Sequence, residues 1–170
     1  MDFESYVRDI EDFPKPGITF KDITPLLNDS NALIEASDAL YQLVDGQTID
    51  KVVGVDSRGF IFAPMLASKL NAGFVPVRKK GKLPYKTTAE SYALEYGTDI
   101  LEIHTDAILK GEKVLVHDDV LATGGTASAV CKLVEKLGGE VVQCNFLVQL
   151  GFLNGADKLN GYDIKSLIEY

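Results

Sequence analysis

The stretch VLVHDDVLATGGTAS, residues 114–128, places two adjacent carboxylates before a short threonine- and glycine-rich segment. An apolar run precedes Asp118 and Asp119, and small residues typical of a helix follow Thr126. Glycines lack a Cβ and let backbone amides converge on a ligand, and a helix N-terminus adds about half a positive charge. The segment from Ala122 to Thr126 therefore predicts a cradle for one phosphate group.

The two carboxylates need a different partner, because they would repel the phosphate that the neighbouring loop attracts. Asp118 and Asp119 can accept hydrogen bonds from a polyol or hold a magnesium ion. A phosphate beside a vicinal diol is a ribose 5-phosphate. The stretch lacks the Gly-Lys-Ser/Thr ending of a Walker P-loop and the G-x-G-x-x-G pattern. The alternative is an acidic strand end followed by a capped helix.

These residues need a scaffold, and the chain alternates between strand-like and helix-like segments. The predicted strands are 51–55, 74–77, 114–116, 140–150 and 164–168, and the predicted helices are 31–44, 60–70 and 126–137. Gly73 is expected to close the turn after the second of these helices. Such alternation predicts an α/β fold with a mostly parallel sheet flanked by helices, and ligands of such sheets bind at the carboxyl ends of the strands.

Composition limits the class of protein. The 170 residues show no repeat and no linker, so a single domain over residues 1–170 is expected. A net charge of −8 argues against a binder of nucleic acid or membranes, which would need a basic face. No signal peptide and no run of roughly 18 apolar residues is visible, which favours a cytoplasmic protein. Cys131 and Cys144 lack metal or redox spacing and are expected to be buried thiols.

The two acids followed by Ala-Thr-Gly-Gly-Thr resemble the phosphoribosyl pyrophosphate signature of the type I phosphoribosyltransferases. Four further motifs resemble those of the adenine-specific members of that family: FPKPGITFKDI at 13–23, GVDSRGF at 54–60, RKKGKLP at 78–84 and SYALEYG at 91–97. The resemblance implies the type I fold with a small N-terminal hood segment over the base site. It also implies purine salvage, in which phosphoribosyl pyrophosphate and adenine give AMP and pyrophosphate.

The resemblance implies roles for individual residues. It assigns phosphoribosyl pyrophosphate and AMP binding to Ala122, Thr123, Gly124, Gly125, Thr126, Asp118, Asp119, Arg58, Ser57, Arg78, Lys79 and Lys82. It assigns adenine binding to Thr19, Phe20, Lys21 and Leu150. The Asp56-Ser57 peptide is typically cis in this family. Magnesium is expected to bind mainly through phosphoribosyl pyrophosphate, with no metal site made by the protein alone, and the family forms homodimers.

Glu95 is implied to be the catalytic acid/base, acting on N7 of the purine. Tyr92 and Tyr96 on either side of it suggest a lid that excludes water. The segment 79–97 is expected to be open and mobile without ligand, because its basic residues would repel one another. In a chain of net charge −8, five basic residues within 78–86 are better explained by a pyrophosphate ligand than by a solvated loop.

Two positions depart from some family members, which have arginine at the place of Lys21 and glutamate at the place of Gln149. Both departures bear on contacts with the base, not on the reaction. Two alternative functions are a phosphoribosyltransferase for hypoxanthine or xanthine and a non-catalytic regulator that senses phosphoribosyl pyrophosphate. The first typically lacks Leu-Glu-Tyr-Gly at this position, and the second usually adds a DNA-binding domain and a basic face. His117 is interpreted as structural.

Overall fold

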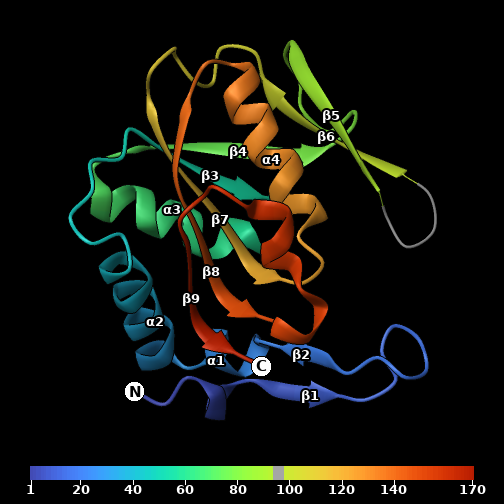
Figure 1. Ribbon diagram of the computed structural model, residues 1–170. Helices are drawn as coiled ribbons and strands as arrows, with labels where there is room; N and C mark the ends of the chain where they lie inside the picture. The colour runs from blue at the N-terminus through green and yellow to red at the C-terminus, as the bar shows by residue number, and fades with distance from the viewer. Residues whose placement is uncertain (94–97) are drawn as a thin grey trace.

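The computed structural model describes residues 1–93 and 98–170. Its centre is a seven-stranded sheet in the order β5-β6-β4-β3-β7-β8-β9 (Figure 1). Five adjacent strands run parallel: β4 (Gly73–Lys79), β3 (Lys51–Val55), β7 (Lys113–Leu121), β8 (Glu140–Gln149) and β9 (Ile164–Glu169). The predicted α/β fold with a mostly parallel sheet is confirmed.

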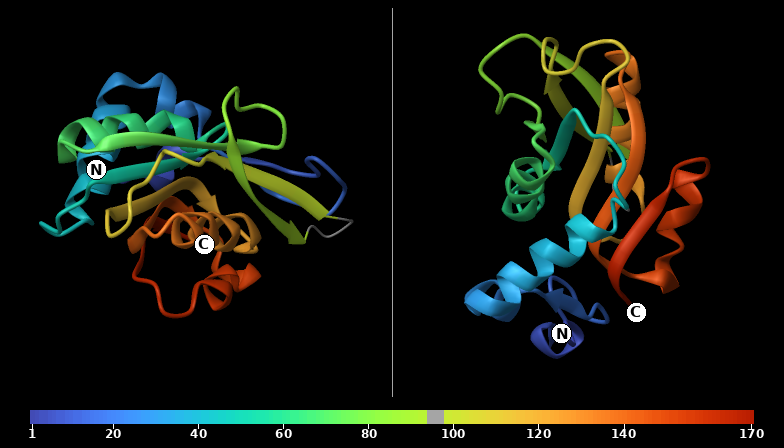
Figure 2. Two further views of the ribbon diagram at one scale, coloured as in Figure 1. Left: turned by 90° about the horizontal axis from the view of Figure 1, so that it is seen from above. Right: turned by 90° about the vertical axis from the view of Figure 1, so that its left-hand side faces the viewer.

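Helices cover both faces of the sheet. The helices α2 (Ser30–Gln42) and α3 (Gly59–Leu70) lie on one face and α4 (Gly125–Lys136) lies on the other (Figure 2). Successive side chains of β3 enter different cores: Val52 packs with α2 and α3, whereas Val53 packs with α4. Because strands buried on both faces are apolar throughout, these central strands were visible in the sequence. In the described part of the chain, no helix is long and apolar enough to span a membrane.

Two helix ends illustrate how local chemistry sets the element boundaries. Asp29 caps α2, since its Oδ1 accepts hydrogen bonds from the backbone N–H groups of Asn31 and Ala32 at 3.0 and 2.9 Å. The prediction that Gly73 closes the turn after α3 was wrong. Asn71 ends that helix with a left-handed φ of 53°, a conformation that asparagine adopts more readily than most residues, and Gly73 begins β4.

An antiparallel hairpin extends the sheet beyond β4. Its strands are β5 (Thr87–Ala93) and β6 (Thr98–His104), and β6 also pairs with β4. The segment 79–97, which is expected to be open and mobile without ligand, therefore contains a strand that the sequence did not predict. That strand reads TTAESYA and alternates half-buried with exposed residues. Its sequence lacks the apolar run or apolar alternation that indicates a strand.

A two-stranded ribbon near the N-terminus lies outside the main sheet. Its strands are β1 (Arg8–Ile10) and β2 (Phe20–Asp22), and the short helix α1 (Thr24–Asn28) follows. The ribbon lies beside the carboxyl end of β9 (Figure 1). Short 3-10 segments occupy Glu4–Tyr6, Gly151–Leu153 and Gly155–Leu159. The ribbon corresponds to the hood segment that the family resemblance implied.

Candidate active site

The phosphate loop, residues 122–126, connects β7 to α4 and borders a cavity of about 80 Å³. Gly124 directly precedes α4 and has a left-handed φ of 76°. A Cβ at Gly124 would lie 2.1 Å from the carbonyl oxygen of Gly155, so both the conformation and the space require glycine. The N-terminus of α4 offers unpaired backbone N–H groups to this cavity, which suits a phosphate.

The strand before this loop is longer than predicted. β7 continues to Leu121, so the expectation that it stops at the two acids was wrong. Asp118 lies opposite Phe146 of β8, and sheet pairing therefore fixes the position of its backbone. His117 is fully buried and its Nδ1 lies 3.0 Å from Oδ1 of Asn145, in agreement with a structural role.

The two acids differ in their surroundings. Asp119 is 5% exposed, and its Oδ2 lies 2.5 Å from Nε of Arg58. Burial raises the pKa of Asp119, and the positive charge of Arg58 opposes that rise. Burial also raises the pKa of Asp118, and the neighbouring charge of Asp119 raises it further. A bound ligand that brings positive charge close to this pair would be strongly attracted, because the carboxylates have little water around them.

The loop after β3 brings charged groups together beside these acids. The Asp56-Ser57 peptide is cis, as expected. The Asp56 carboxylate contacts Nε of Arg78 at 3.0 Å and Nζ of Lys82 at 3.3 Å. The hydrogen bond from Arg78 lowers the pKa of Asp56. Asp56 thus holds these two cations near each other and offsets part of their mutual repulsion, a partner that the expectation of repulsion had not included.

A second cavity of about 280 Å³ lies beside the phosphate loop. Its lining comprises Val55, Asp56, Ser57, Arg58, Lys79, Tyr92, Leu101, Asp118, Asp119 and Thr126. Lys79 is held by Asp99, whose Oδ2 lies 2.8 Å from Nζ. Burial raises the pKa of Tyr92, which therefore stays protonated as a hydrogen-bond donor. Cationic and hydroxyl donors thus border this space together with the carboxylates of Asp56, Asp118 and Asp119. An anion bound here could contact the donors, and a metal ion or a polyol could contact the carboxylates.

A third cavity, of about 360 Å³, has an apolar and aromatic lining on one side. It is bordered by Ile18, Thr19, Phe20, Lys21, Arg58, Asp118, Asp119, Val120, Ala122, Thr126, Leu150 and Leu153. The guanidinium carbon of Arg58 lies 4.9 Å from the centre of the Phe20 ring, and Phe13 meets that ring edge-on at 5.2 Å. A flat apolar ring with polar edges fits between such walls.

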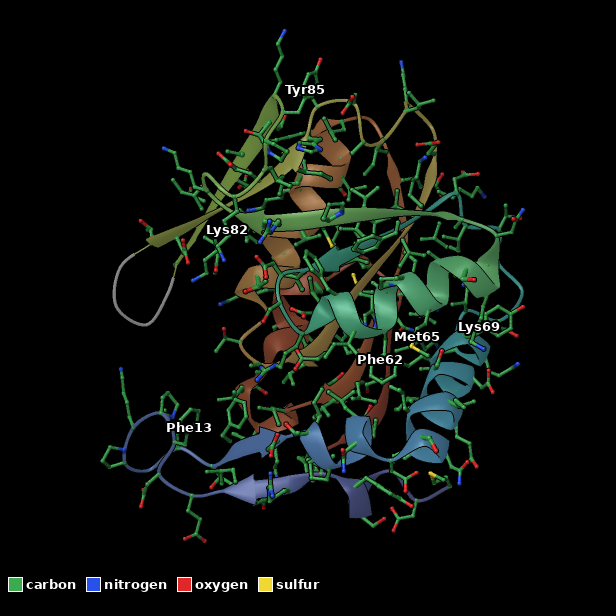
Figure 3. The ribbon with its side chains drawn as sticks, turned by 180° about the vertical axis from the view of Figure 1, so that it is seen from behind. Phe13, Phe62, Met65, Lys69, Lys82 and Tyr85 are labelled. Atoms are coloured by element: carbon green, nitrogen blue, oxygen red, sulfur yellow. The ribbon has the colours of Figure 1, made fainter. Side chains whose placement is uncertain are left out.

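Figure 3 shows this region from behind: Lys82 lies in the basic turn after β4, residues 80–86, and Phe13 lies in the loop that joins the two strands of the N-terminal ribbon. The structure brings the predicted site residues to the same three cavities, with two exceptions. Arg78 and Lys82 contact Asp56 and line none of them. Glu95 and Tyr96 lie outside the described residues.

Sequence reasoning missed several residues of the site, among them Val55, Asp56 and Leu101 in the second cavity and Leu121 and Ala127 in the first. Ile18, Val120 and Leu153 line the third cavity. Gly155 packs its backbone against the phosphate loop, and a Cβ there would lie 2.2 Å from the carbonyl oxygen of Ala122. The pair Asn154-Gly155 was a turn signal in the sequence, but nothing local indicated that the turn touches a loop so distant along the chain.

The described residues contain no group of three or more His, Cys, Asp or Glu side chains close enough to hold a metal ion. Asp118 and Asp119 nevertheless place carboxylate oxygens on the second and third cavities. Magnesium usually combines one or two carboxylates with water and substrate phosphates, and these acids fit that role.

Comparison with known proteins identifies similar chains. Residues 22–165 match the family model of the phosphoribosyl transferase domain. The chain is 66% identical over 170 residues to an adenine phosphoribosyltransferase of Christiangramia forsetii, covering 100% of this chain and 99% of the relative. A crystal structure of that enzyme from Thermoanaerobacter pseudethanolicus is 51% identical, has a TM-score of 0.97 and shares 99% of this chain and 98% of that one. The Saccharomyces cerevisiae enzyme, solved with adenine and an imino-altritol bisphosphate, is 39% identical with a TM-score of 0.92 and shares 97% of this chain and 96% of that one.

Proposed function

The chain belongs to the phosphoribosyl transferase family, and on that premise we propose that it transfers the 5-phosphoribosyl group of phosphoribosyl pyrophosphate to adenine. The products are AMP and pyrophosphate, and the reaction salvages a purine. The observation that carries the proposal is that all three cavities share Asp118 and Thr126. One continuous site therefore has a compartment for the 5-phosphate, one for pyrophosphate and one for the base.

The acids act at the ribose. As the bond from C1 to pyrophosphate breaks, positive charge develops on the sugar before N9 of adenine completes the new bond. Asp118 and Asp119 accept hydrogen bonds from the ribose hydroxyls and attract that charge. Their attraction increases as the charge develops, so it stabilises the transition state more than the bound substrate.

The cations act on the leaving group. Arg58 and Lys79 line the compartment proposed for pyrophosphate, and so does Ser57, which belongs to the cis peptide. Arg78 and Lys82 lie next to it, and their contacts with Asp56 keep them close while no phosphate is bound. Pyrophosphate carries more negative charge than one carboxylate, so both cations gain charge-assisted hydrogen bonds when it arrives. Magnesium would bind mainly through the phosphates and would neutralise part of their charge.

The base site is proposed to hold adenine between Phe20 and Leu150. Backbone groups of Thr19 and Lys21 read the edge of the ring. Glu95 is proposed to exchange a proton with N7, and Tyr92 and Tyr96 to close the site. Each role follows from the match between these positions and the family's motifs.

The oligomeric state and the cellular compartment are proposed on the same basis. We propose a homodimer in the cytoplasm. The helix α3 supports the first point, since Phe60, Ile61 and Met65 on it are only half-buried and Phe74 beside Phe60 is 37% exposed. Light scattering at assay concentration is expected to give twice the chain mass.

The function is tested by pyrophosphate release from phosphoribosyl pyrophosphate with adenine, hypoxanthine, guanine or xanthine. Adenine is expected to support turnover when magnesium is present, and a chelator is expected to stop it. Equal or better turnover with hypoxanthine or xanthine would contradict the choice of base. Binding of phosphoribosyl pyrophosphate without turnover of any purine would instead favour the non-catalytic regulator.

A further inference from the structure

The base compartment has two walls that come from different parts of the chain. The ribbon β1–β2 supplies Phe20, and the end of β8 supplies Leu150. A two-stranded ribbon is marginally stable alone, so its position over the compartment depends on what anchors it. The salt bridge from Arg8 to Asp22, at 2.6 Å, joins the two strands of the ribbon to each other and does not reach the sheet.

Tyr170 touches both walls. Its ring lies 3.7 Å from Nζ of Lys21, the neighbour of Phe20 in β2. Its backbone carbonyl accepts a hydrogen bond of 2.7 Å from the N–H of Gly151, and its own N–H donates to the carbonyl of Gln149 at 3.0 Å. These two hydrogen bonds flank Leu150. Figure 1 shows the end of β9 beside β2, where this contact lies.

The contact between Lys21 and Tyr170 is sheltered from water. The Lys21 side chain is only 14% exposed, and its Nζ also lies 2.7 Å from Oδ1 of Asp9 in β1. Burial raises the pKa of the Tyr170 hydroxyl, and the charge of Lys21 opposes the rise. A cation over an aromatic ring is worth more when both are desolvated. The side chain of Lys21 is therefore committed to anchoring, which leaves only its backbone to contact a base.

We propose that Tyr170 is a positioning residue for adenine. It fixes the ribbon, through Lys21, to the same backbone segment that carries Leu150, and so sets the gap between the two walls that enclose the base. This inference rests on the proposed function and extends it to a residue outside the three cavities. Tyr170 does not touch adenine; it acts through Phe20 and Leu150.

The test compares variants of the full chain by steady-state kinetics at saturating phosphoribosyl pyrophosphate and magnesium. Tyr170→Leu removes the ring but keeps an apolar side chain, and Lys21→Met removes the cation. Each is expected to raise KM for adenine about three- to tenfold, with kcat changed by less than about twofold and KM for phosphoribosyl pyrophosphate unchanged. Because both remove the same contact, the double variant is expected to resemble either single one.

Two controls separate positioning from a general loss of stability. Tyr170→Phe keeps the ring, so it is expected to retain the wild-type KM for adenine. Tyr162→Leu removes a half-buried tyrosine before the other end of β9, where its hydroxyl donates to Glu135 at 2.6 Å. It is expected to lower the melting temperature without raising KM for adenine.

Each outcome is decisive. If the wild-type chain is active and neither Tyr170→Leu nor Lys21→Met changes the KM for adenine, the positioning role alone is overturned. It is also overturned if Tyr162→Leu raises the KM for adenine as much as Tyr170→Leu does. A third contradicting result is a double variant in which the effects of the two single substitutions on this KM add. If Tyr170→Leu does not fold, Lys21→Met tests the same contact from the ribbon. A wild-type chain that does not turn over adenine would overturn the proposed function, and this inference with it.

Discussion

The phosphate loop and the base compartment are built in opposite ways. The phosphate loop is one contiguous segment, and backbone geometry shapes it: Gly124 is left-handed and its Cα faces the carbonyl oxygen of Gly155. The base compartment takes its walls from the ribbon and from the end of β8. Its defining contacts are between side chains, such as Arg58 over the ring of Phe20.

This difference predicts different consequences of substitution. A change in the phosphate loop is expected to displace backbone that we propose binds the substrate in the ground state and in the transition state. A change in a wall of the base compartment weakens adenine alone, which raises one KM and leaves kcat nearly constant. The following predictions test this separation.

The largest effect is expected at Gly124. In Gly124→Ala the new Cβ would lie 2.1 Å from the carbonyl oxygen of Gly155, so the phosphate loop must move. Misplacing a substrate by about 1 Å costs about 10²-fold and losing an anion donor costs about 10²- to 10³-fold, so kcat/KM for phosphoribosyl pyrophosphate is expected to fall about 10³-fold. Steady-state kinetics measure this.

Gly161→Ala is the matched control for Gly124→Ala. Gly161 has a left-handed φ of 96°, but nothing lies within 4 Å of the place that a Cβ would take, so the substitution adds backbone strain without a clash. Its kcat/KM is expected to stay within about twofold of wild type. A fall as large as that of Gly124→Ala would mean that strain, not the shape of the phosphate loop, explains the loss.

Glu95→Gln tests the chemical step separately from the binding of substrate in either compartment. Glu95→Gln keeps the size of the side chain and removes the exchangeable proton. If Glu95 acts on N7 in the transition state, kcat is expected to fall about 10²-fold or more while the affinity for phosphoribosyl pyrophosphate hardly changes. Glu90→Gln, at a glutamate paired with Lys136 at 2.5 Å, is the control and should retain kcat. An unchanged kcat in Glu95→Gln would mean that Glu95 has no role in the chemical step.

Leu150 tests the base compartment itself. Leu150→Ala removes one of the two faces that enclose the ring, so KM for adenine is expected to rise about tenfold, equivalent to about 1.4 kcal/mol. KM for phosphoribosyl pyrophosphate should stay constant. Leu109→Ala, at a leucine that is 67% exposed, is the control and should change neither value. Equal increases in both KM values for Leu150→Ala would show that the two compartments are not independent.

The smallest effect concerns the basic turn, residues 80–86, which is largely exposed. Trypsin is expected to cut first after Lys80, Lys82 or Lys86 in the ligand-free protein. Phosphoribosyl pyrophosphate with magnesium is expected to slow that cut severalfold, because the cations gain an anionic partner, whereas neutral adenine supplies none. Cleavage after Lys110, in an exposed turn after β6, serves as the internal reference. Equal protection by adenine alone would contradict a lid that closes on pyrophosphate.

The turn at residues 122–126 and the helix after it could be predicted from the sequence because their physics is local. Two glycines, adjacent threonines and a following helix occur within a few residues, and the five parallel strands showed as apolar segments. The cis peptide at Asp56-Ser57 was expected from the family motif. These features depend on neighbours in the chain, and a motif describes such neighbours completely.

The rest depends on contacts between distant segments, which no motif contains. The role of Gly155 against the phosphate loop and that of Tyr170 against Lys21 appear only when the chain is folded. The hairpin β5–β6 was missed because the exposed residues of β5 are small and its half-buried residues are mostly polar, so no apolar face is visible in the sequence. The pairing of Arg78 and Lys82 with Asp56 was not expected, because the carboxylate comes from a different strand end.

The most direct test of the proposed site is a crystal structure of the protein with AMP. We expect the 5-phosphate on the backbone of residues 122–126, the ribose hydroxyls on Asp118 and Asp119, and the adenine ring between Phe20 and Leu150. One ligand would then occupy the phosphate loop and the base compartment at once. AMP with its base outside the Phe20–Leu150 gap, or with its phosphate among Arg58, Arg78 and Lys79 and not on the phosphate loop, would contradict the proposed site.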